Sequence, residues 1–125
     1  GVGISGWAIE TNGAGTLTSM GGRDDNASGA TPLPANGVSI ADLNWHFYLF
    51  VLQRGSGIKI YKDGVLGNGP IPLVDIENFV ETENFTMGSV AGGGFWCACV
   101  LDDVRIYNRA LSASEVSSVY SAGPQ

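Results

Sequence analysis

Basic side chains are scarce in this sequence: six Lys and Arg face twelve Asp and Glu, which gives a net charge of -6. Because an acidic surface repels a phosphate backbone on average, we expect no nucleic-acid partner. The sequence also has no uninterrupted apolar run near the roughly 18 residues that cross a bilayer, so we expect no membrane partner. These absences favour an acidic folded domain over a nucleic-acid-binding or membrane-embedded protein.

The sequence has only two cysteines and one histidine, so few residues could bind a transition metal or act as a catalytic nucleophile. On a strand, Cys97 and Cys99 would point to the same face, and their short separation makes a mutual disulfide awkward. Zinc would need ligands beyond this pair and the distant His46, so we favour two small buried apolar residues. His46 has no Ser or Cys nucleophile pattern nearby, so we expect a packed or hydrogen-bonded strand histidine rather than a Ser-His-Asp triad.

What the sequence does contain is the pattern of a turn-rich β protein. Apolar residues make up 44% of the 125 residues and Gly accounts for 19, which argues against disorder and fits a single domain, 1–125. An Asn-Gly-Ala-Gly turn within residues 6–20 predicts a hairpin. Residues 45–53 are apolar on both faces, as in a central strand that is covered from both sides.

Turn residues delimit the remaining strands. The Arg-Gly-Ser-Gly run at 54–57 and the pair Asp63-Gly64 predict turns on either side of a strand at 58–62. Two prolines restrict residues 65–82 to loop and edge, since proline cannot donate to a central ladder. Further strands are expected at 83–90 and 95–107.

The pattern changes near the C-terminus, where one helix is predicted to begin near Ala113. Ser112 followed by Glu115 is a capping box, and Leu111 with Val116 can form a hydrophobic staple across it. A following Gly-Pro pair ends the helix. The residues expected to be buried in the whole chain are Trp45, Phe47, Leu49, Val51, Ile58, Ile60, Val104, Ile106 and Val116.

Three blocks, in this order, resemble one known family: NWHFYLFVLQRGSGIKIYKDGVL, FTMGS and LDDVRIYNRALSASEVSSVY, which together cover roughly residues 44–121. They are similar to a strand-and-turn block, a short strand and the C-terminal signature of the laminin-G-like, concanavalin-A-like lectin/glucanase family. The resemblance implies an all-β fold, an antiparallel β-sandwich of concanavalin-A-like jelly-roll type, with one short C-terminal helix. Complete members begin with strands that have no counterpart here, so the chain resembles the C-terminal two-thirds of such a domain.

Two adjacent carboxylates, Asp102 and Asp103, fall within the predicted strand 95–107. Alternation places Asp103 with Arg105 on the outer face, where a partly solvated ion pair is expected. Asp102 would share the inner face with apolar residues, and a buried carboxylate needs backbone N–H donors, a cation or a metal. In related lectins and glucanases the Asp at this place often holds structural calcium. The resemblance therefore implies Ca²⁺ at Asp102, as an alternative to a carboxylate that the protein satisfies alone.

Catalysis finds little support in the sequence. Glucanases of this fold use a strand with a Glu-x-Asp-x-(x)-Glu pattern, in which alternating carboxylates face one cleft. The nearest run has its carboxylates in the wrong order, at Asp75, Glu77, Glu81 and Glu83. We expect this run to be a solvated loop and the protein not to be an enzyme.

Binding chemistry is better represented. Proteins recognise sugars with aromatic faces beside carboxylates and amides. The aromatic candidates are Trp7, Tyr61, Phe79, Phe85 and Trp96, and the polar candidates are Asp24, Asp25 and Asn26. We expect a non-catalytic, secreted or cell-surface module that binds a glycan or polysaccharide. The alternatives are a protein-interaction or structural adhesion module of the same fold, and a fragment of a glycoside hydrolase.

A sandwich without its opening strands would expose a sheet edge and apolar surface, and both invite association. Since residues 45–53 are apolar on both faces, we expect the chain to form a homo-oligomer through an extensive apolar contact there, unless residues 1–40 fold back to cover the gap.

Overall fold

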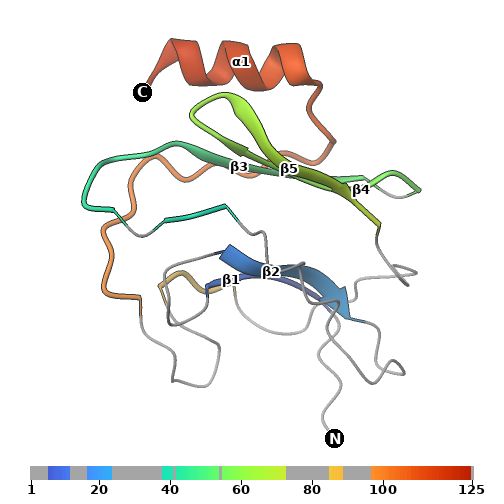
Figure 1. Ribbon diagram of the computed structural model, residues 1–125, viewed down its shortest axis with the longest axis horizontal. Helices are drawn as coiled ribbons and strands as arrows, with labels where there is room; N and C mark the ends of the chain where they lie inside the picture. The colour runs from blue at the N-terminus through green and yellow to red at the C-terminus, as the bar shows by residue number, and fades with distance from the viewer. Residues whose placement is uncertain are drawn as a thin grey trace, which may run out of the picture.

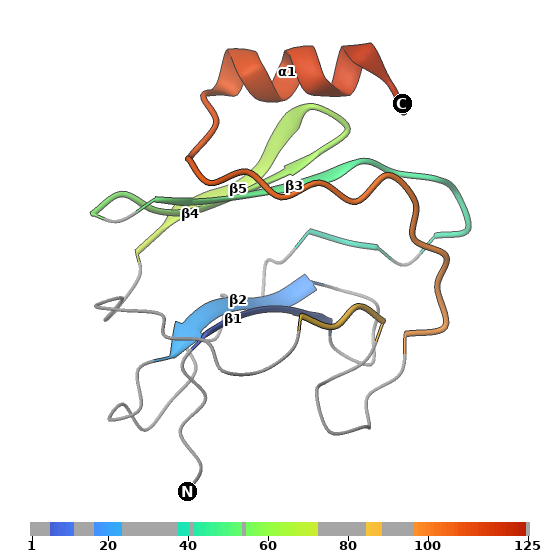
Figure 2. The same cartoon turned by 180° about the vertical axis from the view of Figure 1, so that it is seen from behind.

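The computed structural model describes residues 6–11, 17–23, 38–40, 42–53, 55–72, 85–88 and 97–124. The strands are β1 (Gly6–Thr11), β2 (Leu17–Arg23), β3 (Tyr48–Gln53), β4 (Gly57–Lys62) and β5 (Val65–Ile71), and the helix is α1 (Ala113–Ala122). They stack in layers: α1 covers one face of the β3-β4-β5 sheet, and the β1-β2 hairpin lies on the opposite side (Figure 1). The view from behind in Figure 2 shows the same order of layers.

The first two strands form the hairpin that the Asn-Gly-Ala-Gly turn predicts. β1 and β2 pair antiparallel, from Gly6 opposite Arg23 to Thr11 opposite Leu17, with one irregularity between Glu10 and Thr11. The paired residues extend three positions beyond the predicted range, because β2 continues to Arg23.

The second sheet consists of three antiparallel strands. β3, β4 and β5 are antiparallel in that order, so β4 is the central strand and β3 lies at an edge of the described sheet. The prediction that 45–53 contains a strand covered on both faces is confirmed for β3, whose side chains pack into one core on each face of the sheet. The prediction that proline restricts the chain after residue 65 to an edge is confirmed, because β5 contains Pro70 and pairs on one side with β4.

Alternation divides the apolar side chains of this sheet between two cores. The face under α1 packs Leu49, Val51, Tyr61, Leu111 and Val116, with Phe47, Ala110 and Val119 partly buried beside them. The opposite face packs Ile58, Ile60 and Ile71, with Val38, Ile40, Tyr48, Phe50 and Leu52 partly buried around them. Burial is therefore confirmed for five of the predicted core residues, Leu49, Val51, Ile58, Ile60 and Val116, and is partial for Phe47.

Three predicted core residues are exposed. Trp45 is 69% exposed, Val104 is 52% exposed and Ile106 is 65% exposed. The described parts of two predicted strands, 85–88 and 97–107, have no strand pairing. Without a paired neighbour a segment has no sheet to turn its apolar face toward, and the positive φ of Asp103, 50°, bends the chain out of extended alternation. For this reason the described residues do not make up a full sandwich.

The helix begins and ends as its sequence signals predict. The Ser112 hydroxyl accepts a hydrogen bond from the Glu115 N–H, and the Glu115 carboxylate accepts one from the Ser112 N–H, so the capping box is complete. Leu111 and Val116 pack in the same core on either side of this cap. Hydrogen bonds from Arg109 and from Ser112 lower the pKa of Glu115 from its ordinary 4.5 to about 2. No helix in the described part of the chain is long and apolar enough to span a membrane.

Because Val116 is buried and Val104 is exposed, replacing each by Ala should change the free energy of unfolding by different amounts. Val116→Ala removes two methyl groups from a fully buried site and should lower the free energy of unfolding by about 1–4 kcal/mol. Val104→Ala, at a side chain that is 52% exposed, should change it by no more than about 0.5 kcal/mol. Urea unfolding of dilute samples measures both. Equal losses would mean that residue 104 is buried in solution.

Candidate functional site

The structure does not bring the sequence-predicted binding residues together. Tyr61 is only 4% exposed, because its ring packs in the core under α1, and its assignment as a sugar contact is therefore wrong. Trp7 lies in β1, opposite Gly22 of β2. Phe85 is 56% exposed. The other candidates fall outside the described residues: Asp24, Asp25, Asn26, Phe79 and Trp96, together with Asp75, Glu77, Glu81 and Glu83 of the glucanase-like run.

A cluster of charged side chains lies instead where the chain enters β3. Its centre is His46, whose two ring nitrogens each face a carboxylate. Nδ1 lies 2.7 Å from Asp63 Oδ2, and Nε2 lies 2.8 Å from Asp42 Oδ2 and 3.0 Å from Asp42 Oδ1. We call these three residues the His46 clamp. The prediction of a hydrogen-bonded histidine is confirmed, and the clamp joins two carboxylates that are far apart in the sequence.

The Asp63 side of the clamp is fixed by a tight turn. Asp63 and Gly64 both have positive φ, 51° and 78°, and together they connect β4 to β5, as the Asp-Gly pair predicts. The Asp63 N–H donates to the Phe47 carbonyl at 2.8 Å, and the Phe47 N–H donates to Asp63 Oδ1 at 3.0 Å. A Cβ on Gly64 would lie 2.7 Å from the Tyr120 ring, so glycine also allows α1 to approach the turn.

The Asp42 side is held by contacts with Asn44 and Lys62. Asp42 Oδ1 accepts a hydrogen bond from the Asn44 N–H at 2.8 Å, and Lys62 Nζ lies 3.7 Å from Asp42 Oδ2. Lys62 Nζ and the Tyr48 hydroxyl both donate to the Ser39 carbonyl at 3.1 Å. Residues 42–47 are thus attached at both ends to the same end of the β3-β4-β5 sheet.

The electrostatics of the clamp favour a charged imidazole. Hydrogen bonds to Asp63 and to Asp42 raise the pKa of His46 above its ordinary 6.5. A neutral imidazole has a single N–H, whereas the protonated ring can donate to both carboxylates at once. The pKa of Asp42 is lowered by the Asn44 N–H and then by His46. Burial opposes the same effect at Asp63, but the bonds from Phe47 and His46 outweigh it and lower the pKa of Asp63.

The segment that the clamp holds carries an exposed aromatic ring. Trp45 is 69% exposed and lies between Asn44 and His46 in the sequence, and the neighbouring Leu43 is fully exposed. A tryptophan face beside amide and carboxylate oxygens is the combination that packs against a sugar ring and binds its hydroxyls. Sequence reasoning missed this site because it assigned Trp45 to the core. The available signal was the density of polar residues around it, Asp42, Asn44 and His46.

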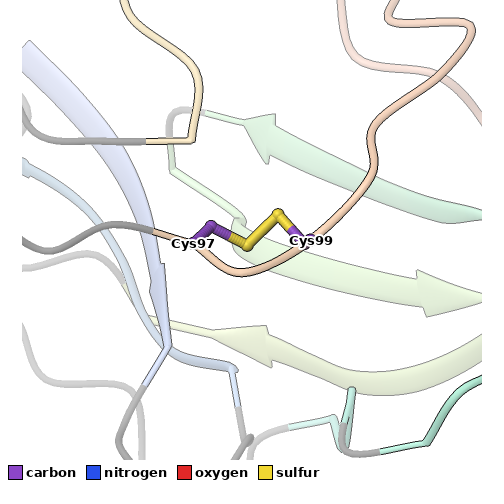
Figure 3. The surroundings of a disulfide bond; sticks show 2 residues. All are labelled: Cys97 and Cys99. Atoms are coloured by element: carbon purple, nitrogen blue, oxygen red, sulfur yellow. A yellow bond between two sulfur atoms is a disulfide. The ribbon is translucent and has the colours of Figure 1, made fainter.

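The cysteines and Asp102 also differ from expectation. Cys97 and Cys99 form a disulfide with a Cα–Cα separation of 5.2 Å, and both are exposed rather than buried (Figure 3). The bond is possible because the chain there is bent rather than straight: successive same-face residues of a regular strand lie roughly 6.5 Å apart. The pair lies outside any strand in Figure 3.

Asp102 is exposed, and its Oδ1 accepts a hydrogen bond from the Asp103 N–H at 2.8 Å. The predicted need to neutralise a buried charge therefore does not arise. The described residues contain no group of three His, Cys, Asp or Glu side chains that could hold a metal ion. Calcium at Asp102 stays a prediction. The expected ion pair of Asp103 with Arg105 is confirmed, with two bonds of 2.7 and 2.8 Å.

Comparisons with known proteins agree on the fold. A family model described as the concanavalin A-like lectin/glucanases superfamily matches residues 1–117. No curated protein matches the chain. Among solved structures, the chain is similar to a crystal structure of an S-layer domain-containing protein from Clostridium thermocellum, with a TM-score of 0.54 and 19% identity over 84% of this chain and 49% of that one. The chain thus spans about half the length of that structure, and at this identity the likeness concerns the fold alone.

The clamp predicts that the free energy of unfolding decreases as pH rises above the ordinary pKa of histidine, 6.5. Because the pKa of His46 is raised in the folded state, its contribution is fully present below the ordinary 6.5 and is lost as pH rises through the raised value. His46 is the sole histidine, so one ring signal in a proton NMR titration gives its pKa directly. Unfolding experiments across the same pH range should show that the free energy of unfolding falls as His46 loses its proton. In the His46→Gln variant this fall should be absent. A measured pKa at or below 6.5 would contradict the clamp.

Proposed function

The chain belongs to the concanavalin A-like lectin/glucanases superfamily, and on this premise we propose that it is a non-catalytic module that binds carbohydrate. The observation that carries the proposal is the exposed Trp45 on a segment held at both ends by the His46 clamp. Because the residues on both sides of Trp45 are already held, its backbone loses little conformational freedom on binding, which favours affinity. The ring would pack against the apolar face of a sugar, and Asn44 and Asp42 would bind its hydroxyls.

The arrangement of the carboxylates supports binding rather than hydrolysis. A glycosidase needs two carboxyl groups about 5–10 Å apart, with the scissile bond between them. In the clamp, the imidazole of His46 occupies the space between Asp42 and Asp63 and contacts both. Neither carboxylate is therefore available as a nucleophile or as a general acid. No observation on the described residues favours a fragment of a glycoside hydrolase.

Two observations support a secreted or cell-surface location. The Cys97–Cys99 disulfide is exposed, and exposed disulfides persist in oxidising compartments. The similar solved structure is described as an S-layer domain-containing protein. A protein-interaction or adhesion module is the second candidate, and the exposed apolar residues Val100, Leu101, Val104 and Ile106 favour it.

Substitution of Trp45 tests the carbohydrate proposal. A glycan array identifies a ligand, and calorimetry measures its affinity for the native chain and for Trp45→Ala. Loss of the ring should weaken binding by roughly tenfold or more, which corresponds to about 1.4 kcal/mol. Phe85→Ala is the matched control, because Phe85 is also an exposed aromatic residue, at 56%, but lies outside residues 42–47. It should leave the affinity unchanged.

Other results would redirect the proposal. Saturable sugar binding that survives Trp45→Ala would place the site elsewhere on the chain. The absence of any sugar binding would favour the protein-interaction module, and cleavage of a polysaccharide would show a hydrolase.

A further inference from the structure

Residues 100–108 lie outside any helix or strand and are unusually exposed. Five large apolar side chains lie close together in this stretch and are open to solvent: Val100 (75%), Leu101 (55%), Val104 (52%), Ile106 (65%) and Tyr107 (42%). If the bend at Asp103 were straightened into a strand, the apolar residues at 100, 104 and 106 would lie on one face and those at 101 and 107 on the other. Such a run of exposed apolar residues marks an interaction surface.

Within the described part of the chain, no strand pairs with the backbone of this segment. Among the described residues, the backbone bonds outside helices and strands include one from the Cys97 N–H to the Gly88 carbonyl at 2.8 Å, and none to residues 98–110. The Asp103 N–H donates to the side chain of Asp102. Unpaired N–H and C=O groups beside exposed apolar side chains form the template on which another extended chain can add as a strand.

We propose that this segment is a homodimerisation strand, which pairs antiparallel with the same segment of a second copy about a two-fold axis at Val104. This register places Asp103 opposite Arg105 of the second copy, twice by symmetry. On the same face, Leu101 lies opposite Tyr107 of the second copy. Val104 meets its own equivalent on the axis.

Charge selects this register over its neighbours. A residue on the two-fold axis lies opposite the same residue of the second copy. An axis at Asp102 or at Asp103 would therefore place two carboxylates opposite each other, and an axis at Arg105 would do so for two guanidinium groups. Like charges directly opposite each other in an antiparallel pair are destabilising. Of the four axes from residue 102 to residue 105, only the one at Val104 puts opposite charges across from each other.

The single chain already contains the ion pair that the dimer would use. Asp103 has a φ of 50°, and this bend lets Arg105 reach back to the same carboxylate with two hydrogen bonds. Pairing would straighten Asp103 and exchange the contact within the chain for one between chains. The number of ion pairs stays the same, so association is driven by the backbone bonds and by burial of the exposed apolar residues.

This location differs from the one that the sequence predicts. Residues 45–53 were expected to form the contact, but Leu49 and Val51 lie buried under α1, and Phe50 and Leu52 are packed against the opposite core. The uncovered apolar surface lies in the C-terminal segment before the helix.

Charge complementation between two variants tests the proposal. Sedimentation and light scattering should show a concentration-dependent dimer of the native chain. Asp103→Arg alone and Arg105→Asp alone should each weaken the dimer by about tenfold or more, because each places like charges opposite each other. An equimolar mixture of these two variants should restore dimerisation as a heterodimer. Neither variant can form the pair within its own chain, so restoration reports a contact between chains.

A symmetric cross-link locates the axis. Val104→Cys should form a disulfide-linked dimer under mild oxidation, whereas Ser117→Cys on the exposed surface of α1 should not. A native chain that stays monomeric, single variants that dimerise as well as the native chain, a mixture that stays monomeric, or equal cross-linking at both sites would each overturn the proposal.

Discussion

The arrangement of residues 42–47 and of the turn between β4 and β5 depends on one interaction, the placement of a histidine between two carboxylates. His46 joins Asp42, before β3, to Asp63, in the turn between β4 and β5. The Asp63 N–H donates to the Phe47 carbonyl, and the Phe47 N–H donates to the Asp63 carboxylate, so the contact between the two strands continues one residue pair beyond Tyr48 and Lys62. The position of residues 42–47, and with it the exposure of Trp45, therefore follows from one partly exposed hydrogen-bond network at the end of the sheet rather than from packing in the core.

The same turn connects this network to the helix. Gly64 lies against the Tyr120 ring, and the Phe47 and Tyr120 rings lie 5.8 Å apart. Val116 anchors the helix in the core one turn earlier, where it is fully buried with Leu49 and Val51. The helix thus covers the apolar face of the sheet and also supports the turn that carries Asp63. Apolar packing under the helix and the hydrogen bonds of the clamp therefore both stabilise the turn at Asp63 and Gly64.

Sequence reasoning succeeded where the signal is local. The Asp-Gly turn, the capping box of Ser112 and Glu115, and the alternation of β3 and β4 depend on residues within a few positions of each other, and all are confirmed. It failed where burial depends on a distant partner. Val104 and Ile106 were judged inward from alternation, and Trp45 from the family resemblance, but neither signal says whether a second sheet covers that face. The clamp was missed because His46 and Asp63 meet only through the register of a hairpin, 17 residues apart in sequence.

The two proposals reinforce each other physically. The carbohydrate proposal rests on residues 42–46 and the pairing proposal on residues 100–108, so the two surfaces share no residue and pairing would not consume Trp45. A single exposed aromatic ring supports only weak binding to one sugar unit, whereas a glycan or polysaccharide repeats its units along a chain. Two copies joined at Val104 would present two such rings, and the second contact would become intramolecular, which raises the overall affinity without any new contact. The acidic net charge of -6 does not oppose this, because a neutral glycan is not repelled and each Asp103 lies opposite an Arg105 across the axis.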